Sequence, residues 1–110
     1  MIPPRRIKVM ADYGCDALWF MDGGEVGCFS PREIGVPEDL SAALEQWARD
    51  FDGAIDWNDP ANGPGWSDGD HAAHSERGYA LAVRLAAALR DAGHATTVHY
   101  SENGHVTPIG

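Results

Sequence analysis

Residues 50–76 read DFDGAIDWNDPANGPGWSDGDHAAHSE, and this stretch divides the chain because most of it fits neither a helix nor a strand. The Gly-Pro-Gly run at 63–65 excludes a helix or a central strand at its middle. Connections between packed helices usually take about 2–8 residues, and longer ones are more often functional or disordered. Disordered segments carry few aromatic residues, whereas this one holds Trp57 and Trp66. We therefore expect an ordered loop between two helices.

The same stretch is strongly acidic. It contains no Lys or Arg, and its acids are Asp50, Asp52, Asp56, Asp59, Asp68, Asp70 and Glu76. The whole chain carries a formal net charge of −9 and has a pI of about 4.7. Nucleic acids and anionic membranes attract clustered Lys and Arg, so this balance argues against both as direct partners. It favours a basic partner or one without charge.

The segment before this stretch has the pattern of an amphipathic helix. Pro37, followed by Glu38 and Asp39, is typical of a first helical turn. The helix would end near 52–53. Its apolar face follows the spacing i, i+4, i+7, i+8 and i+11 at Leu40, Leu44, Trp47, Ala48 and Phe51.

A second helix is predicted from Ser67, as N-cap, to about Ala92. Asp70 stands three residues after Ser67, which is the spacing of a capping box. Gly93 suits the position just past a helix end. The same apolar spacing recurs at Leu81, Leu85, Ala88, Leu89 and Ala92.

Short strands are predicted before the helices. Residues 7–11 alternate, residues 17–21 form an apolar run, and residues 26–29 form a return strand. Gly23-Gly24 predicts the hairpin turn between the last two. A two-residue turn there places Trp19 opposite Cys28.

In that register Cys15 is not expected to reach Cys28 across the hairpin. A disulfide-stapled domain would also be richer in Cys. Asp12 and Asp16 flank Cys15, and their charges would raise the pKa of its thiol. We therefore expect both cysteines to be reduced and to act as small apolar side chains.

Residues 95–100 predict a further strand, and Asn103-Gly104 could turn the chain into a last strand at 105–107, before a loose tail at 108–110. The order is β-β-β-α-α-β. With 110 residues, 44% of them apolar, the chain has the size of one α+β domain spanning 1–110. We predict a two-layer sandwich, in which a four- or five-stranded, mostly antiparallel sheet carries both helices on one face.

Two kinds of catalytic site are weighed against simpler interpretations. His71 and His74 could both face one metal ion from a helix, but zinc signatures such as H-E-x-x-H are absent. Paired carboxylates among Asp50, Asp52, Asp56 and Asp59 could act as general acid and base, but solvated acids are the usual reading of such a run. We expect no metal, no cofactor and no catalytic residue.

The tryptophans of the acidic stretch have two interpretations. One is expected to fold back over the helix ends, while the other stands exposed within an acidic rim. An exposed aromatic side chain among carboxylates suits contact with a cationic protein partner. The predicted partner-binding residues are Asp50, Asp52, Asp56, Trp57, Asp59, Trp66, Asp68 and Asp70.

Three motifs carry a resemblance to known proteins. They are D-Y-G-C-D-A-L-W at 12–19, W-A-R-D-F-D at 47–52 and D-W-N-D-P at 56–60. Together they resemble a set of small bacterial proteins that is similar to immunity proteins, which neutralise toxins of interbacterial competition. The resemblance implies a basic nuclease toxin as partner, masked at its active site. Asp56 departs from the Asn-Trp pattern of that loop, so no role is carried over to position 56.

The first hypothesis is therefore an acidic immunity or inhibitor protein that binds a basic toxin through residues 50–70. The second is a small interaction module, or a subunit of an assembly, that uses a sheet edge as its interface. The third is a metal-dependent hydrolase built on His71 and His74. No signal peptide and no apolar run of about 18–20 residues is visible, so we expect a cytoplasmic protein.

Overall fold

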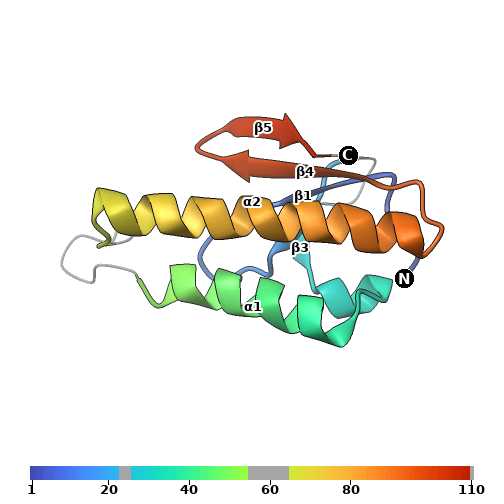
Figure 1. Ribbon diagram of the computed structural model, residues 1–110, viewed down its shortest axis with the longest axis horizontal. Helices are drawn as coiled ribbons and strands as arrows, with labels where there is room; N and C mark the ends of the chain where they lie inside the picture. Colours follow the sequence, from blue (N-terminus) through green and yellow to red (C-terminus); the bar gives the residue numbers. More distant parts are fainter. Residues whose placement is uncertain (23–25, 55–64, 110) are drawn as a thin grey trace.

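The computed structural model describes residues 1–22, 26–54 and 65–109, and in these ranges it contains five strands, two α-helices and one short 3-10 helix (Figure 1). The elements are β1 (Arg6–Val9), β2 (Leu18–Phe20), β3 (Cys28–Phe29), η1 (Pro31–Ile34), α1 (Glu38–Asp52), α2 (Asp68–Asp91), β4 (Thr97–Glu102) and β5 (His105–Pro108). The predicted α+β class and element order are confirmed, with β5 as the optional last strand.

The strands form one mixed sheet in the order β3-β2-β1-β4-β5. Three neighbouring pairs are antiparallel, and β1 and β4 are parallel. Parallel neighbours need a long crossover connection, and here the helices lie within the chain that joins β1 to β4. The sheet is therefore mostly antiparallel, as predicted.

The two helices form the second layer. Figure 1 shows α1 and α2 side by side, with α2 between α1 and the β4–β5 hairpin. Helix α2 packs against β1 and β4, and α1 packs against α2 and η1. In β1, Ile7 and Val9 are fully buried while Lys8 between them is partly exposed. One face of the sheet thus contributes to the hydrophobic core. Within the described ranges, no helix has the length and apolar composition for crossing a membrane.

Both predicted helix boundaries are close to the observed ones. The Ser67 hydroxyl accepts a hydrogen bond from the Asp70 backbone N–H (3.1 Å), and the Asp70 carboxylate accepts one from the Ser67 N–H (3.2 Å). This capping box starts α2, and Gly93 follows its end with φ at 85°. Pro37 is the N-cap of α1 rather than its first residue, because its backbone is extended (ψ 145°).

The last hairpin also follows the sequence signal. Asn103 and Gly104 have positive φ angles of 51° and 80°, as tight hairpin turns require. The prediction of a loose tail was wrong for Pro108 and Ile109. Pro108 belongs to β5, and the Ile109 N–H donates to the Val98 carbonyl at 2.8 Å.

The first hairpin has the predicted register, since Trp19 lies opposite Cys28. Strand β3 is shorter than the predicted 26–29, and the Gly23-Gly24 turn lies outside the described residues. The expectation that Cys15 stays away from Cys28 was wrong. Cys15 belongs to a turn that precedes β2, and the next N–H, of Asp16, donates to Cys28 Sγ at 3.2 Å.

A reciprocal pair of hydrogen bonds joins the two helices. Trp47 Nε1–H donates to the His74 carbonyl (2.9 Å), and His74 Nε2 lies 3.0 Å from the Trp47 carbonyl, to which it donates. The two rings stack with centroids 4.5 Å apart and an interplanar angle of 6°. Both side chains are buried, at 2% and 6% exposure. Each buried donor therefore finds its acceptor on the opposite helix.

This close approach explains a glycine in the middle of α2. A Cβ atom added at Gly78 would stand 2.5 Å from Trp47 Cζ2 and 2.7 Å from Tyr100 Cε1. Neither ring has room to move away, because both are packed in the core. A side chain at position 78 would force the helices and the sheet apart.

The substitution Gly78→Ala is expected to lower the free energy of unfolding by about 1–3 kcal/mol through overpacking, although Ala favours a helix. Gly69→Ala is the matched control in the same helix, since its added Cβ would meet only Ser67 Oγ at 3.8 Å. That control should be neutral or stabilising by up to about 1 kcal/mol. Urea unfolding followed by tryptophan fluorescence measures both, and equal stability of the two variants would contradict the packing argument.

Candidate functional site

A backbone hydrogen bond joins the two described parts of the acidic stretch, on either side of residues 55–64. The Gly65 N–H donates to the Ala54 carbonyl at 2.8 Å, so these two residues meet beside the end of α1 and the start of α2. Three predicted partner-binding residues, Asp56, Trp57 and Asp59, lie outside the described residues. The other five, Asp50, Asp52, Trp66, Asp68 and Asp70, flank this junction.

Asp50 links the two helices. Its carboxylate accepts hydrogen bonds from Gln46 Nε2 (2.8 Å) and from Arg77 Nη2 (2.7 Å), and its side chain is 32% exposed. Partial burial raises the pKa of Asp50, but the bonds from Gln46 and Arg77 and the Arg77 charge outweigh burial and leave the pKa below its ordinary value. A partner that binds Asp50 must therefore compete with Arg77.

Asp52 holds the turn that follows β1. Its Oδ1 accepts a hydrogen bond from the Gly14 N–H at 2.8 Å, and Gly14 has a left-handed φ of 72°. The Tyr13 ring stacks on Phe51 with centroids 4.7 Å apart. Two motifs that lie far apart in the sequence, at 12–19 and 47–52, therefore meet in space.

A depression of about 420 Å³ lies where this turn meets α1. Its lining residues are Gly14, Cys15, Asp16, Glu45, Ala48, Arg49 and Asp52. The sequence alone did not group Asp12 and Asp16 with the acidic stretch, yet both are exposed beside Tyr13, whose ring stacks on Phe51. One sequence signal could have suggested this grouping. The motifs at 12–19 and 47–52 both belong to the resemblance, and in the structure they are in contact.

Trp66 packs back onto the helix ends. Its ring centroid lies 4.7 Å from His74, 5.4 Å from His71 and 6.0 Å from Phe51. The side chain is half-buried as a result. Trp66 thus has the covering role that the sequence suggested for one of the two tryptophans.

Asp68 and Asp70 occupy the first turn of α2 and are exposed. The positive end of the helix dipole stabilises both carboxylates there. Asp70 also closes the capping box with Ser67, whereas Asp68 has no structural partner among the hydrogen bonds and ion pairs of the described residues. These two acids thus add exposed negative charge next to Trp66.

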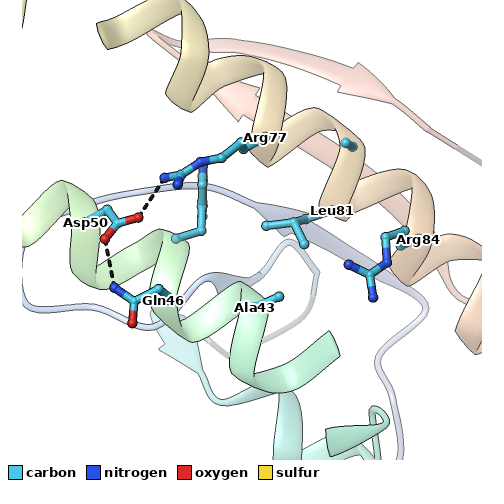
Figure 2. Close-up of a pocket in the computed structure, with 8 residues that line it drawn as sticks. Ala43, Gln46, Asp50, Arg77, Leu81 and Arg84 are labelled. Carbon is cyan, nitrogen blue, oxygen red and sulfur yellow. Dashed lines mark hydrogen bonds and ion pairs between the residues drawn. The ribbon is translucent and has the colours of Figure 1, made fainter. Parts of the chain in front are cut away.

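A groove of about 340 Å³ runs between α1 and α2, next to Asp50 (Figure 2). Its lining residues are Ala43, Gln46, Trp47, Asp50, Arg77, Ala80, Leu81 and Arg84. Figure 2 shows the Gln46–Asp50–Arg77 bonds at one end and Arg84 at the other, with Leu81 between them. The groove is thus mainly apolar, and polar groups close its ends.

The histidines of the metal alternative lie in different surroundings. His71 is exposed beside Trp66, while His74 is buried and directs Nε2 to the Trp47 carbonyl. Among the described residues, no group of three or more His, Cys, Asp or Glu side chains could hold a metal ion. The described geometry therefore gives the hydrolase hypothesis no ligand set.

Together, the fold and this surface define a small, acidic α+β protein with exposed carboxylates around the end of its helix pair. A family model described as Serratia CdiI immunity protein-like matches residues 5–103, and the chain belongs to this family. The match confirms the resemblance to immunity proteins of interbacterial toxin systems and implies a toxin partner. A search of curated proteins gives no match.

The buried His74 predicts a pH effect on stability. Burial lowers the pKa of His74 in the folded state, a nearby Arg77 charge lowers it further, and the Trp47 carbonyl opposes both. In the unfolded chain a His titrates near 6.5, so the unfolded state binds the proton first. The stabilisation is complete above about pH 6.5 and is lost as the pH falls towards the lower folded pKa.

We expect the free energy of unfolding to fall between about pH 7 and pH 5.5, above the range where carboxylates titrate. His74→Gln should be less stable at pH 7.5 and should flatten this dependence. His71→Gln, which removes an exposed imidazole one turn earlier, is the matched control. Denaturant unfolding at several pH values tests this, and an unchanged slope in His74→Gln would contradict it.

Proposed function

We propose that this chain is a cytoplasmic immunity protein that binds and neutralises a basic, nuclease-type toxin through an acidic, Trp-containing surface. Family membership supports the toxin partner. The observation that carries the finer proposal is the gathering of acids from three segments around one aromatic contact. Tyr13, Phe51 and Trp66 touch in series, with centroid distances of 4.7 and 6.0 Å.

This aromatic series holds three acidic segments together. Asp12 and Asp16 flank Tyr13, Asp52 follows Phe51, and Asp68 and Asp70 follow Trp66. We call these five acids, with Asp50 and the acids of the 55–64 segment, the acidic surface. Nuclease active sites bind phosphates through Lys and Arg, so carboxylates held at one surface can occupy the same positions. The net charge of −9 also accelerates encounter with a basic protein.

We propose Trp57 as the aromatic anchor of the contact with the toxin. Trp66 already packs against His74 and Phe51, which leaves it less area to offer to a partner. Tryptophan is enriched among the residues that dominate binding energy, particularly when charged groups surround it. Asp56 and Asp59 flank Trp57 in the sequence and would pair with Lys or Arg of the toxin.

The double variant Asp56→Lys/Asp59→Lys is expected to abolish protection and to weaken toxin binding by roughly tenfold or more, because like charges then face each other. The toxin is first identified by affinity capture at low salt and by growth inhibition that this chain suppresses. Protection is scored by co-expression, and binding by calorimetry. Full protection by this variant would overturn the acidic-surface mechanism.

The matched control reverses two acids at the opposite end of the helix pair, Asp39→Lys/Asp91→Lys. Both positions are exposed, and the change in net charge is the same. This control should protect as the unchanged protein does. Circular dichroism of both variants separates loss of binding from loss of folding.

Binding should also weaken steeply with salt. Exposed charges are screened over about 10 Å at 0.1 M ionic strength and about 3 Å at 1 M. We expect affinity to fall by roughly tenfold or more between about 50 and 500 mM NaCl. Affinity that is constant over this range would favour an apolar contact, such as one in the α1–α2 groove, over the acidic surface.

The interaction-module hypothesis has one observation in its favour. Strand β5 lies at the edge of the sheet, and all four of its residues are exposed. Edge strands offer backbone groups for pairing with another chain, although Pro108 removes one donor. This alternative predicts self-association that does not respond to loop charge, which light scattering of the two double variants would detect.

A further inference from the structure

The strongest feature outside the acidic surface is the pair of cysteines near the first hairpin. The Asp16 N–H donates to Cys28 Sγ at 3.2 Å, and Asp16 directly follows Cys15. Standard backbone dimensions put that nitrogen about 2.4 Å from the Cys15 Cα. The Cys28 sulfur therefore lies within about 5.6 Å of the Cys15 Cα. The Cys15 side chain therefore starts close to the Cys28 sulfur, and a disulfide additionally requires the two Cα atoms to be about 4.4–6.8 Å apart.

The local structure brings the two cysteines together. Cys15 ends a tight turn in which its N–H donates to the Asp12 carbonyl at 3.3 Å. Cys28 opens β3, opposite Trp19. Both cysteines are free and half-buried, so a small oxidant can reach them. A hydrogen bond with Cys28, together with burial and the charges of Asp12 and Asp16, raises the pKa of the Cys15 thiol to about 11.

We propose that Cys15 and Cys28 form a reversible intramolecular disulfide when the protein meets a peroxide. Because the raised pKa keeps the Cys15 thiol protonated, the Cys28 sulfur, as thiolate, attacks a peroxide oxygen, the O–O bond breaks, and a sulfenic acid and water form. The second sulfur then attacks the first, the S–O bond breaks, and a second water leaves. The two thiols lose two electrons and two protons, and the peroxide is reduced to water. A small dithiol reverses the bond by exchange.

The bond would fix the turn that carries Asp12 and Asp16. Hydrogen bonding to Asp52 already holds this turn on the α1 side through Gly14. A disulfide would hold its other side to β3 and would close a loop of about 14 residues, which restricts the unfolded chain. We expect the oxidised protein to melt at a temperature higher by about 5 °C or more. This inference does not depend on the identity of the toxin.

The test uses the full chain, reduced with dithiothreitol and then freed of it, at low micromolar concentration with hydrogen peroxide. The expected product is a monomer lighter by about 2 Da, without reactive thiols, in which proteolysis yields one peptide pair joined through Cys15 and Cys28. Dithiothreitol should restore both the mass and the thiols. Thermal melts of the two forms measure the shift.

The variants Cys15→Ser and Cys28→Ser provide the controls, because each leaves one thiol. Each should gain oxygen atoms or form disulfide-linked dimers instead of losing 2 Da. If the unchanged protein does the same under peroxide, the inference is wrong. A linked monomer that melts at or below the temperature of the reduced form would overturn the stabilising role. This comparison uses only the unchanged protein, so it does not depend on whether a variant folds.

Discussion

The reciprocal hydrogen bonds between Trp47 and His74 are the constraint on which the rest of the structure depends. Both side chains bury a polar N–H, and an unpaired buried donor costs about 1–3 kcal/mol. Each N–H finds the backbone carbonyl of the other residue, so one helix cannot slide along the other without breaking both bonds. This fixed register in turn aligns Asp50 with Arg77 and Phe51 with Trp66.

The carboxylates near the ends of these helices form two populations. Asp50, Asp52 and Asp70 accept hydrogen bonds from Arg77, Gly14 and Ser67 respectively. Asp12, Asp16 and Asp68 are exposed, as Asp70 is, and Asp12 accepts a hydrogen bond only from the neighbouring Tyr13 N–H among the described contacts (2.8 Å). An ion pair with a partner at these exposed acids displaces mostly water. Exposed pairs contribute about 0–1 kcal/mol each, so their main effects would be on encounter rate and specificity. Tight binding therefore requires an apolar anchor in addition to charge.

Local sequence patterns predicted the helix faces, the helix cap and the last turn, because neighbouring residues determine these features. The apolar spacing, the Ser67–Asp70 capping box and the Asn103-Gly104 turn each depend on residues within a few positions, and the structure contains all three, except that Ala92 is exposed at the C-cap of α2. Contacts between distant segments were missed because no local pattern encodes them. The need for glycine at position 78 arises only from Trp47 and Tyr100 beside it in the fold, and Cys15 approaches Cys28 through a turn that the strand pattern does not reveal.

The candidate site also has features that the sequence shows directly and features that depend on contacts between distant residues. Its acids and tryptophans were visible in the sequence, and Trp66 has the expected covering role. The contribution of the 12–16 turn depends on a hydrogen bond across 38 positions, from Gly14 to Asp52, which composition alone does not predict. Roles for Asp56, Trp57 and Asp59 remain predictions tested by the charge-reversal experiment.

The hydrogen bond between Gly65 and Ala54 has a consequence for how such proteins diversify. It joins the chain on either side of residues 55–64 through backbone atoms, so it does not depend on which side chain either residue carries. The capping box at Ser67 and the bonds between Trp47 and His74 lie outside this segment, and loop length alters closure entropy only slowly. Under the proposed function, a change of sequence at 55–64 would give one scaffold recognition of a new toxin without requiring a new fold.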